Sequence, residues 1–295
     1  MNPISHHLSN PMHPGKFFTT LPPLVDDIKA LQPPVDVIVY DCMLYLPQIV
    51  GKILDIPAVG LVPNTGPACT ASYENKVMQE LFDGPKKWVQ STYGIDIFEL
   101  GTPFSSWYSS LLMNIVLTCN DLYMGCKTEA QEQKFGEAPF HCVGSLIDPQ
   151  QNSKRIPIPG FSIDAITAAR NVGKKIILLS FGTAVTGIMW ERMMPGDHGF
   201  SSGRDFARFV WKTAFVALGN SEEFLVVMTC SCRDDAFEDL KDSIPNNFLT
   251  FTVVPQLDIL PLGSVFITHG GMGSVMESIV FNVPMIVLPV FWGSI

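Results

Sequence analysis

Residues 254–290 read VPQLDILPLGSVFITHGGMGSVMESIVFNVPMIVLPV, and this stretch decides the fold. The apolar run Val265–Thr268 is followed by a turn with two adjacent glycines, a helical pattern over about 274–281, and a second apolar run over 285–290. Short, continuous apolar strands that alternate with helices are typical of a parallel sheet covered on both faces. The stretch therefore predicts an α/β fold.

The same alternation extends upstream. Residues 175–181, 224–229 and 248–254 are apolar runs typical of buried strands, and residues 205–218 predict a helix. Ligands of doubly wound sheets bind beyond the carboxyl ends of the strands. Gly182-Thr183, Pro255-Gln256 and the turn at 269–271 each follow a strand, so we expect them to face one crevice.

The first half of the chain shows a similar pattern less clearly. Residues 35–63 comprise an apolar run that ends at Asp41, a helical stretch and a second apolar run. Residues 138–144 predict one more short strand. Between them, residues 68–123 are mostly helical in pattern, with a turn predicted at 83–85. This half is also predicted to be α/β.

A break between two domains is expected near the middle of the chain. Residues 145–160 contain three prolines, a glycine and several polar residues, which favours a linker. The chain has 295 residues, of which 47% are hydrophobic, and is therefore long enough for two domains of ~150 residues. We expect an N-terminal domain over 1–150, a linker over 151–170 and a C-terminal domain over 171–295.

The composition excludes several classes of protein. The formal net charge is −9, with 19 lysines and arginines against 28 aspartates and glutamates, so nucleic acid is not an expected partner. The 7 cysteines are irregularly spaced and form no C-x-x-C pair, which favours reduced thiols. Neither a signal-peptide pattern nor an uninterrupted apolar segment of about 18 residues is present. We therefore expect no membrane span and a cytoplasmic location.

The turn His269-Gly270-Gly271 carries the strongest chemical signal. Adjacent glycines let the backbone approach a ligand, and the helix that follows offers free N–H groups and a partial positive charge to an anion. The segment matches neither the phosphate loop of ATPases nor the G-x-G-x-x-G fingerprint, so neither ATP nor NAD chemistry is supported. Alternatives stay open, because Ser274 and Glu277 have the spacing of a capping box and His269 alone is compatible with a packed histidine.

The segment 254–290 resembles the family 1 UDP-glycosyltransferases, in particular their macrolide and sterol glycosyltransferase-like branch. Two further segments share this resemblance: ILLSFGT at 177–183 and DVIVYDCMLYLPQIVGKILDIPAV at 36–59. The resemblance implies a GT-B fold, in which two Rossmann-like domains with parallel sheets face each other across a cleft. It also implies that the N-terminal domain is incomplete and the C-terminal domain truncated in this chain. The implied reaction transfers a hexose from a UDP-sugar to a hydroxyl of a small lipophilic acceptor, with inversion, and needs neither a metal nor a further cofactor.

The resemblance also implies which residues bind the UDP-sugar donor. Gln256 would contact uracil, His269 the diphosphate and Glu277 the ribose hydroxyls. The backbone amides of Gly271, Gly273 and Ser274 would hold phosphate oxygens. Gly182 and Thr183 would line the other side of the nucleotide.

Asp41 is the candidate catalytic residue. By resemblance it would orient the family's histidine base, although an aspartate at a strand end also often caps the next helix. His6, His7 and His13 lie in a polar, proline-broken stretch and do not match that base. Val253 stands where many members of the family have a tryptophan that stacks on uracil.

These departures leave two hypotheses. In the first, the chain is part of a UDP-dependent hexosyltransferase. In the second, it is a non-catalytic UDP-binding remnant that lacks the general base and the Asp-Gln or Glu-Gln pair with which the family binds the sugar hydroxyls. An NAD-dependent enzyme is disfavoured, because no acidic residue follows the glycine turn at about 20 residues. Residues 184–203 either cover the cleft or form a surface insertion, and we expect the insertion.

Overall fold

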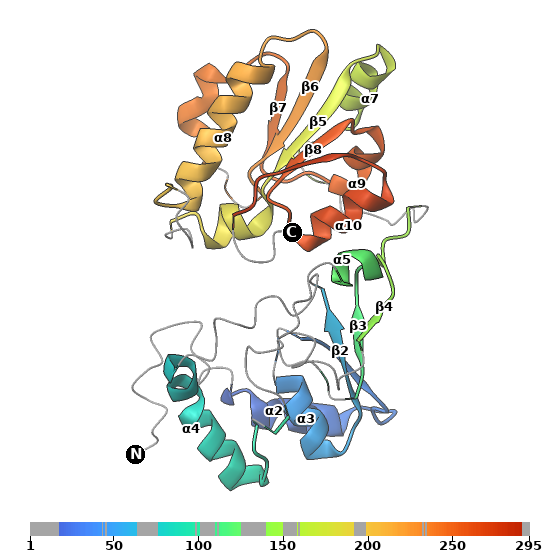
Figure 1. Ribbon diagram of the computed structural model, residues 1–295, viewed down its shortest axis with the longest axis vertical. Coiled ribbons are helices and arrows are strands. Elements are labelled where there is room, and N and C mark those ends of the chain that lie inside the picture. The colour runs from blue at the N-terminus through green and yellow to red at the C-terminus, as the bar shows by residue number, and fades with distance from the viewer. Residues whose placement is uncertain are drawn as a thin grey trace. The chain divides into compact units, whose positions relative to one another are not determined.

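The computed structural model separates the chain into two compact units, Met1–Leu146 and Ile147–Ile295 (Figure 1). The domain limits given above, 1–150, 151–170 and 171–295, stay predictions. Helix α7 (Asp164–Asn171) begins in the range assigned to the linker and ends at the first residue of the range assigned to the C-terminal domain. The structure describes residues 18–42, 44, 46–63, 76–97, 99–100, 110, 112–124, 140–149, 158, 160–191, 199–231, 233 and 235–290.

The first unit is built around a four-stranded parallel sheet with the order β1-β2-β3-β4. The predicted strand, helix and strand within residues 35–63 are confirmed, with Asp41 as the last residue of β1 and paired with Leu61 of β2. In chain order the elements are α2 (Leu21–Ala30), β1 (Ile38–Asp41), α3 (Leu46–Leu54), β2 (Ala58–Val62), α4 (Lys76–Tyr93), β3 (Asn114–Val116), α5 (Asn120–Met124) and β4 (Phe140–Cys142).

Helix α4 contradicts the turn predicted at residues 83–85, because Pro85 lies inside the helix. Phe82 and Val89, on either side of this proline, are both fully buried in the helical core of the unit. Phe82 also makes an edge-to-face contact with Phe18, with ring centroids 6.4 Å apart. A proline inside a helix costs about 3 kcal/mol, and burial of the flanking aromatic and aliphatic side chains offsets this cost.

Strand β3 lies within residues 68–123, where the sequence pattern predicts mostly helix and where α4 and most of α5 are indeed found, so the strand itself is not predicted. The strand has 3 residues and pairs with a parallel neighbour on each side. The side chain of Asn114 fixes its start, since Oδ1 accepts from the amide of Ser110 at 2.7 Å and Nδ2 donates to the Ser110 carbonyl at 2.7 Å. Pairing on both sides thus overrides a weak local pattern.

The second unit contains a five-stranded parallel sheet with the order β7-β6-β5-β8-β9. All strands predicted for this half are confirmed, although β5, β7 and β9 end one to three residues before the predicted positions. In chain order the elements are α7 (Asp164–Asn171), β5 (Lys175–Ser180), the π-helix η2 (Ala184–Ile188), α8 (Gly203–Leu218), β6 (Phe224–Thr229), the 3-10 helix η3 (Glu238–Ser243), β7 (Phe248–Phe251), α9 (Gln256–Ile259), the 3-10 helix η4 (Leu260–Leu262), β8 (Val265–Thr268), α10 (Met272–Val280) and β9 (Met285–Val287).

Helices cover both faces of this sheet, with α8 on one side and α7, α9 and α10 on the other (Figure 1). The side chains of β5 alternate between the two faces, as a strand requires. Ile177 and Leu179 belong to the cluster around Trp211 of α8, whereas Ile176 and Leu178 belong to the opposite cluster. A sheet that is apolar on both faces is the reason why its strands read as continuous apolar runs.

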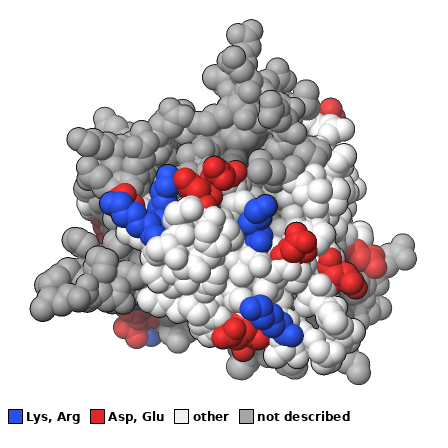
Figure 2. Space-filling model, turned by 90° about the horizontal axis from the view of Figure 1, so that it is seen from below, with Lys and Arg blue, Asp and Glu red and all other residues white. Residues whose placement is uncertain are grey.

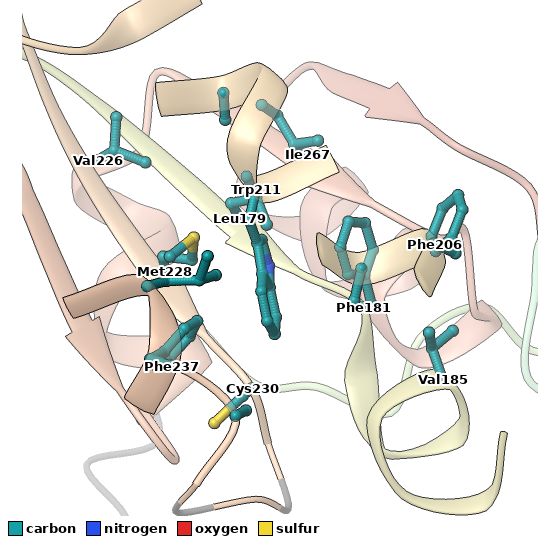
Figure 3. Packing of buried hydrophobic residues seen from close by; sticks show 14 of the residues in the cluster. Leu179, Phe181, Val185, Phe206, Trp211, Val226, Met228, Cys230, Phe237 and Ile267 are labelled. Atoms are coloured by element: carbon teal, nitrogen blue, oxygen red, sulfur yellow. The ribbon is translucent and has the colours of Figure 1, made fainter. Parts of the chain in front are cut away.

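The expectation that residues 184–203 form a surface insertion is wrong for the part of this range that the structure describes, 184–191 and 199–203. Val185 is fully buried and Trp190 is 3% exposed, and both belong to the same core cluster as Trp211. The rings of Trp190 and Trp211 lie 6.1 Å apart between centroids. Figure 3 shows Val185 and Trp211 among the other buried side chains of this cluster. The segment that follows β5 therefore contributes to the core of the unit.

Charged side chains of both signs are mixed on the surface. On the face shown in Figure 2, lysine and arginine side chains lie between aspartate and glutamate side chains. On α4, for example, Lys87 forms an ion pair with Asp83 at 2.6 Å. No helix among the described residues is both long enough and apolar enough to cross a bilayer.

Replacement of Trp211 by alanine is expected to lower the free energy of unfolding by about 3–5 kcal/mol, since this fully buried side chain lies at the centre of the α8 core. Its indole N–H has no acceptor among the described residues, so Trp211→Phe is expected to cost less than Trp211→Ala. Urea unfolding followed by circular dichroism measures both changes.

The matched control is Val216→Ala on the same helix, where the side chain is 89% exposed. This substitution should change the free energy of unfolding by less than about 0.5 kcal/mol. Equal losses for Trp211→Ala and Val216→Ala would contradict the described packing.

Candidate functional site

The loop after β8 presents the first turn of α10 at the carboxyl edge of the sheet. Gly270 has a φ of 79°, which a residue with a side chain adopts only with strain, and its amide donates to Thr268 Oγ1 at 3.3 Å. Gly271 is the N-cap of α10, and no side chain caps the helix there. The first-turn amides of α10 have no carbonyl partners within the helix, which suits them to bind an anion.

The imidazole of His269 packs between two glycines. A Cβ at Gly182 would lie 2.9 Å from His269 Cε1, and a Cβ at Gly271 would lie 2.6 Å from His269 Nε2. Gly182 also has a φ of 63°. Because real Cβ atoms do not come so close, both positions require glycine while the ring occupies this place. His269 is 6% exposed, and burial lowers its pKa to about 4, so the ring is neutral at pH 7.

The carboxyl ends of the strands surround a cavity of about 300 Å³ next to this turn. We call it the strand-end pocket. It is lined by residues from β5, β6, the β7–α9 connection and α10: Ser180, Gly182, Thr183, Thr229, Ser231, Val253, Val254, Gln256, Gly273, Ser274 and Glu277. Hydroxyl groups, one carboxamide and one carboxyl group thus converge on a space bordered by a helix N-terminus. Such an arrangement suits a ligand that carries both an anion and hydroxyl groups.

The structure brings together most of the donor residues predicted from the sequence. Gly182, Thr183, Gln256, Gly273, Ser274 and Glu277 all line the strand-end pocket. His269 and Gly271 are not among its lining residues, although the His269 ring contacts Gly182, which is one of them. The roles of these residues toward a ligand stay predictions.

A polar network links α9 to α10 in the pocket wall. Gln256 Nε2 donates to Ser274 Oγ at 3.3 Å and to Glu277 Oε2. Burial raises the pKa of the Glu277 carboxyl, and the hydrogen bond from Gln256 opposes this shift. The capping-box alternative is wrong, because α10 begins at Met272 and its N-cap is Gly271, so Ser274 lies inside the helix.

Three hydroxyl-bearing residues of the pocket were missed by the sequence reasoning: Ser180, Thr229 and Ser231. Ser231 has a φ of 60°, and its amide donates to Thr229 Oγ1 at 3.2 Å. The Thr229 hydroxyl in turn donates to the Thr252 carbonyl at 2.7 Å. The sequence could have indicated these residues, because they end or follow predicted strands. Ligands of doubly wound sheets bind beyond the carboxyl ends of the strands, and this holds for every parallel strand of the sheet.

Asp41 lies in the first unit at the end of β1, where its carbonyl accepts from the amide of Leu44 at 2.8 Å. Burial and, to a lesser extent, the neighbouring Asp41 carboxylate raise the pKa of the Cys42 thiol to about 12. His6, His7 and His13 lie outside the described residues. Within the described part of the chain, no three His, Cys, Asp or Glu side chains gather as a metal site would require.

Comparison with known proteins shows what the segment around this site is similar to. Residues 237–294 match the UDP-glucoronosyl and UDP-glucosyl transferase family. A segment of 45 residues is 56% identical to an uncharacterized UDP-glucosyltransferase, YdhE, of Bacillus subtilis, and it covers 15% of this chain and 11% of that relative. The resemblance to the UDP-glycosyltransferases is confirmed, whereas the branch within the family stays a prediction.

Solved structures confirm the fold class. The chain superposes on the glycotransferase of kitacinnamycin with a TM-score of 0.59 at 20% identity, over 94% of this chain and 62% of that one. It superposes on Medicago truncatula UGT71G1 complexed with UDP-glucose with a TM-score of 0.55 at 19% identity, over 92% of this chain and 61% of that one. The predicted GT-B fold, with its two Rossmann-like α/β domains, is thus confirmed. The chain spans less than two thirds of these relatives.

Gly271→Ala is expected to lower the free energy of unfolding by about 1–3 kcal/mol, because the added methyl group overlaps the His269 ring. In a double variant with His269→Ala the ring is absent, so the alanine at 271 should add little further loss. Thermal unfolding of Gly271→Ala, of His269→Ala and of the double variant measures both effects.

The matched control is Gly273→Ala, where an added Cβ meets no atom within 4 Å. Alanine is favoured over glycine inside a helix by about 1 kcal/mol, so this variant should be at least as stable as the original chain. Equal destabilisation by Gly271→Ala with and without the His269 ring would contradict the described contact.

Stability should also depend on pH through His269. The unfolded chain binds a proton on this imidazole below its ordinary pKa of 6.5, whereas the folded chain does so only near pH 4. The free energy of unfolding is therefore expected to fall as the pH drops from about 6.5 to about 4, by about 3 kcal/mol in total. Urea unfolding at a series of pH values, compared with His269→Gln, measures this contribution. An identical pH dependence in the two proteins would exclude it.

Proposed function

We propose that this chain, which carries the UDP-glucoronosyl and UDP-glucosyl transferase family match over residues 237–294, binds a UDP-sugar in the strand-end pocket for hexosyl transfer. One observation carries the proposal. The pocket joins the N-terminus of α10 to a partly buried carboxyl group one turn further along the same helix. A nucleoside diphosphate has the complementary pair of groups, an anion and a vicinal diol.

The diphosphate binds at the start of α10. Gly273 and Ser274 both line the pocket, and their amides belong to the first turn of the helix. A helix N-terminus contributes about 0.3–2 kcal/mol toward an anion, so direct hydrogen bonds from these amides and the Ser274 hydroxyl supply the rest. The same groups stabilise the negative charge that develops on UDP as it leaves. Because this charge develops in the transition state, its stabilisation accelerates the transfer.

The ribose binds at Glu277. An ionised carboxylate has two oxygens that only accept hydrogen bonds, and a vicinal diol offers two donors. Glu277 Oε2 already accepts from Gln256, so the carboxylate is held in place before a ligand arrives. Gly182 and Thr183 line the same pocket from the loop after β5 and contact the nucleotide from there.

Transfer follows an inverting single displacement. The acceptor hydroxyl oxygen attacks the anomeric carbon, the bond from that carbon to the phosphate oxygen breaks, and UDP leaves with the electron pair. The proton of the acceptor hydroxyl passes to a general base, which this proposal takes to be a histidine whose tautomer Asp41 fixes; His6, His7 and His13 do not match this base. The acceptor in this proposal is a small lipophilic alcohol, and neither a metal nor a further cofactor takes part.

The chain is expected to bind UDP, and Glu277→Ala is expected to weaken binding about 10- to 100-fold, since a hydrogen bond to a charged group contributes about 1.5–3 kcal/mol. Ser274→Ala removes a neutral hydroxyl and should weaken binding by a smaller factor. Isothermal titration calorimetry measures these affinities, and Glu222→Ala, which removes an exposed carboxylate outside the pocket, is the matched control.

Two results would contradict the proposal: tighter binding of NAD than of UDP, or an equal effect of Glu277→Ala and Glu222→Ala. A parallel assay of sugar transfer to a panel of lipophilic alcohols separates the transferase from a protein that only binds UDP.

A further inference from the structure

Gln256 reaches across the pocket wall to two residues of α10. It is the first residue of α9, and its Nε2 donates to Ser274 Oγ at 3.3 Å and to Glu277 Oε2. These partners lie 18 and 21 residues further along the chain, so the contact is tertiary and joins two separate elements.

The chemistry of the partners fixes the orientation of the carboxamide. An ionised carboxylate only accepts hydrogen bonds, so the nitrogen of Gln256 and not its oxygen must face Glu277. A carboxamide nitrogen carries two hydrogens, and the contacts to Ser274 and Glu277 use both of them. Only the carbonyl oxygen of Gln256 is then left for a ligand, and as an acceptor alone.

Gln256 is itself held firmly. The carbonyl of the preceding Pro255 accepts from the amides of Asp258 at 2.8 Å and Ile259 at 3.3 Å, which closes the turn of α9. Ile259 and Leu260 are both fully buried against the core of the unit. A donor on such an anchored turn can hold a neighbouring carboxylate at a fixed place. The carboxylate then loses little conformational entropy when a ligand binds.

Glu277 needs such a partner. Its carboxyl group is partly buried, and burial favours the neutral form, whereas the hydrogen bond from Gln256 favours the charged form. A neutral carboxyl would lose one of its acceptor sites, and a carboxylate without this partner could turn away from the pocket. Gln256 thus both stabilises the charged form of Glu277 and orients its carboxylate toward the pocket.

We infer that Gln256 is a positioning residue, which holds the Glu277 carboxylate ready for the vicinal hydroxyls of the ligand instead of binding the base. This inference rests on the proposed function, since it assumes that a nucleoside diphosphate occupies the strand-end pocket. It differs from the role implied by the sequence resemblance, in which Gln256 contacts uracil.

The experiment compares the affinities of UDP and 2′,3′-dideoxy-UDP for the unaltered chain and its variants by calorimetry. The unaltered chain should bind UDP at least about tenfold more tightly than the dideoxy ligand, because only UDP offers hydroxyls to Glu277. Gln256→Ala should weaken UDP binding about tenfold and dideoxy-UDP binding less than about twofold. In the presence of Glu277→Ala, the substitution of Gln256 should have little further effect on UDP binding.

An isosteric variant separates the two roles of the glutamine. Gln256→Glu keeps an acceptor oxygen but replaces the donor by a second carboxylate beside Glu277, which raises the cost of charging both groups. It should weaken UDP binding more than Gln256→Ala does, whereas a base contact through the carbonyl oxygen would make it the milder change. Circular dichroism and thermal unfolding verify that each variant is folded, and Glu222→Ala again serves as the control.

The outcomes distinguish the inference from the proposed function. Failure of the unaltered chain to bind UDP contradicts both. UDP binding with equal losses of UDP and dideoxy-UDP affinity in Gln256→Ala overturns the positioning role alone. Additive effects of Gln256→Ala and Glu277→Ala on UDP binding also overturn it, since independent contacts add.

Discussion

The burial of one imidazole ring determines how two loops meet at the carboxyl edge of the second sheet. Strands β5 and β8 are neighbours, with Ser180 paired to Thr268, and the loop after each one continues with a residue that touches the His269 ring. Gly182 and Gly271 have no side chain, so both loops close around the ring. The ring thus lies between the β5 loop and the start of α10, two of the segments that border the strand-end pocket.

The rest of the pocket follows from the topology. In a parallel sheet all carboxyl ends lie at one edge, so residues that end or follow β5, β6, β7 and β8 meet there although up to about a hundred residues separate them in the chain. The core clusters on both faces hold these strands in register, with Trp211 on one face and Phe266 on the other. Packing thereby sets the position of the polar groups, and the network from Gln256 to Glu277 adjusts one of them further. The pocket belongs to one unit, and the candidate catalytic residue Asp41 belongs to the other.

Sequence patterns predicted most of the second unit, because its strands are apolar on both faces and stand out from polar connections. They are less informative where tertiary contacts decide the outcome: β3 has 3 residues and a weak pattern, and α4 continues through the turn predicted at Pro85 because Phe82 and Val89 of the same helix are buried. In the site, the spacing of Ser274 and Glu277 fits both a capping box and a ligand-facing pair, and only the start of α10 at Met272 separates the two. The left-handed backbone of Ser231 and the bond from Gln256 to Glu277 have no local sequence signal, since both depend on residues distant in the chain.

The most direct test of the central claim is a crystal structure of this chain grown with UDP. The account predicts the diphosphate within hydrogen-bonding distance of the amides of Gly273 and Ser274, with the ribose hydroxyls on the carboxylate of Glu277 and the His269 ring still packed between its two glycines. UDP bound elsewhere in the molecule, with the start of α10 free of phosphate, would contradict it.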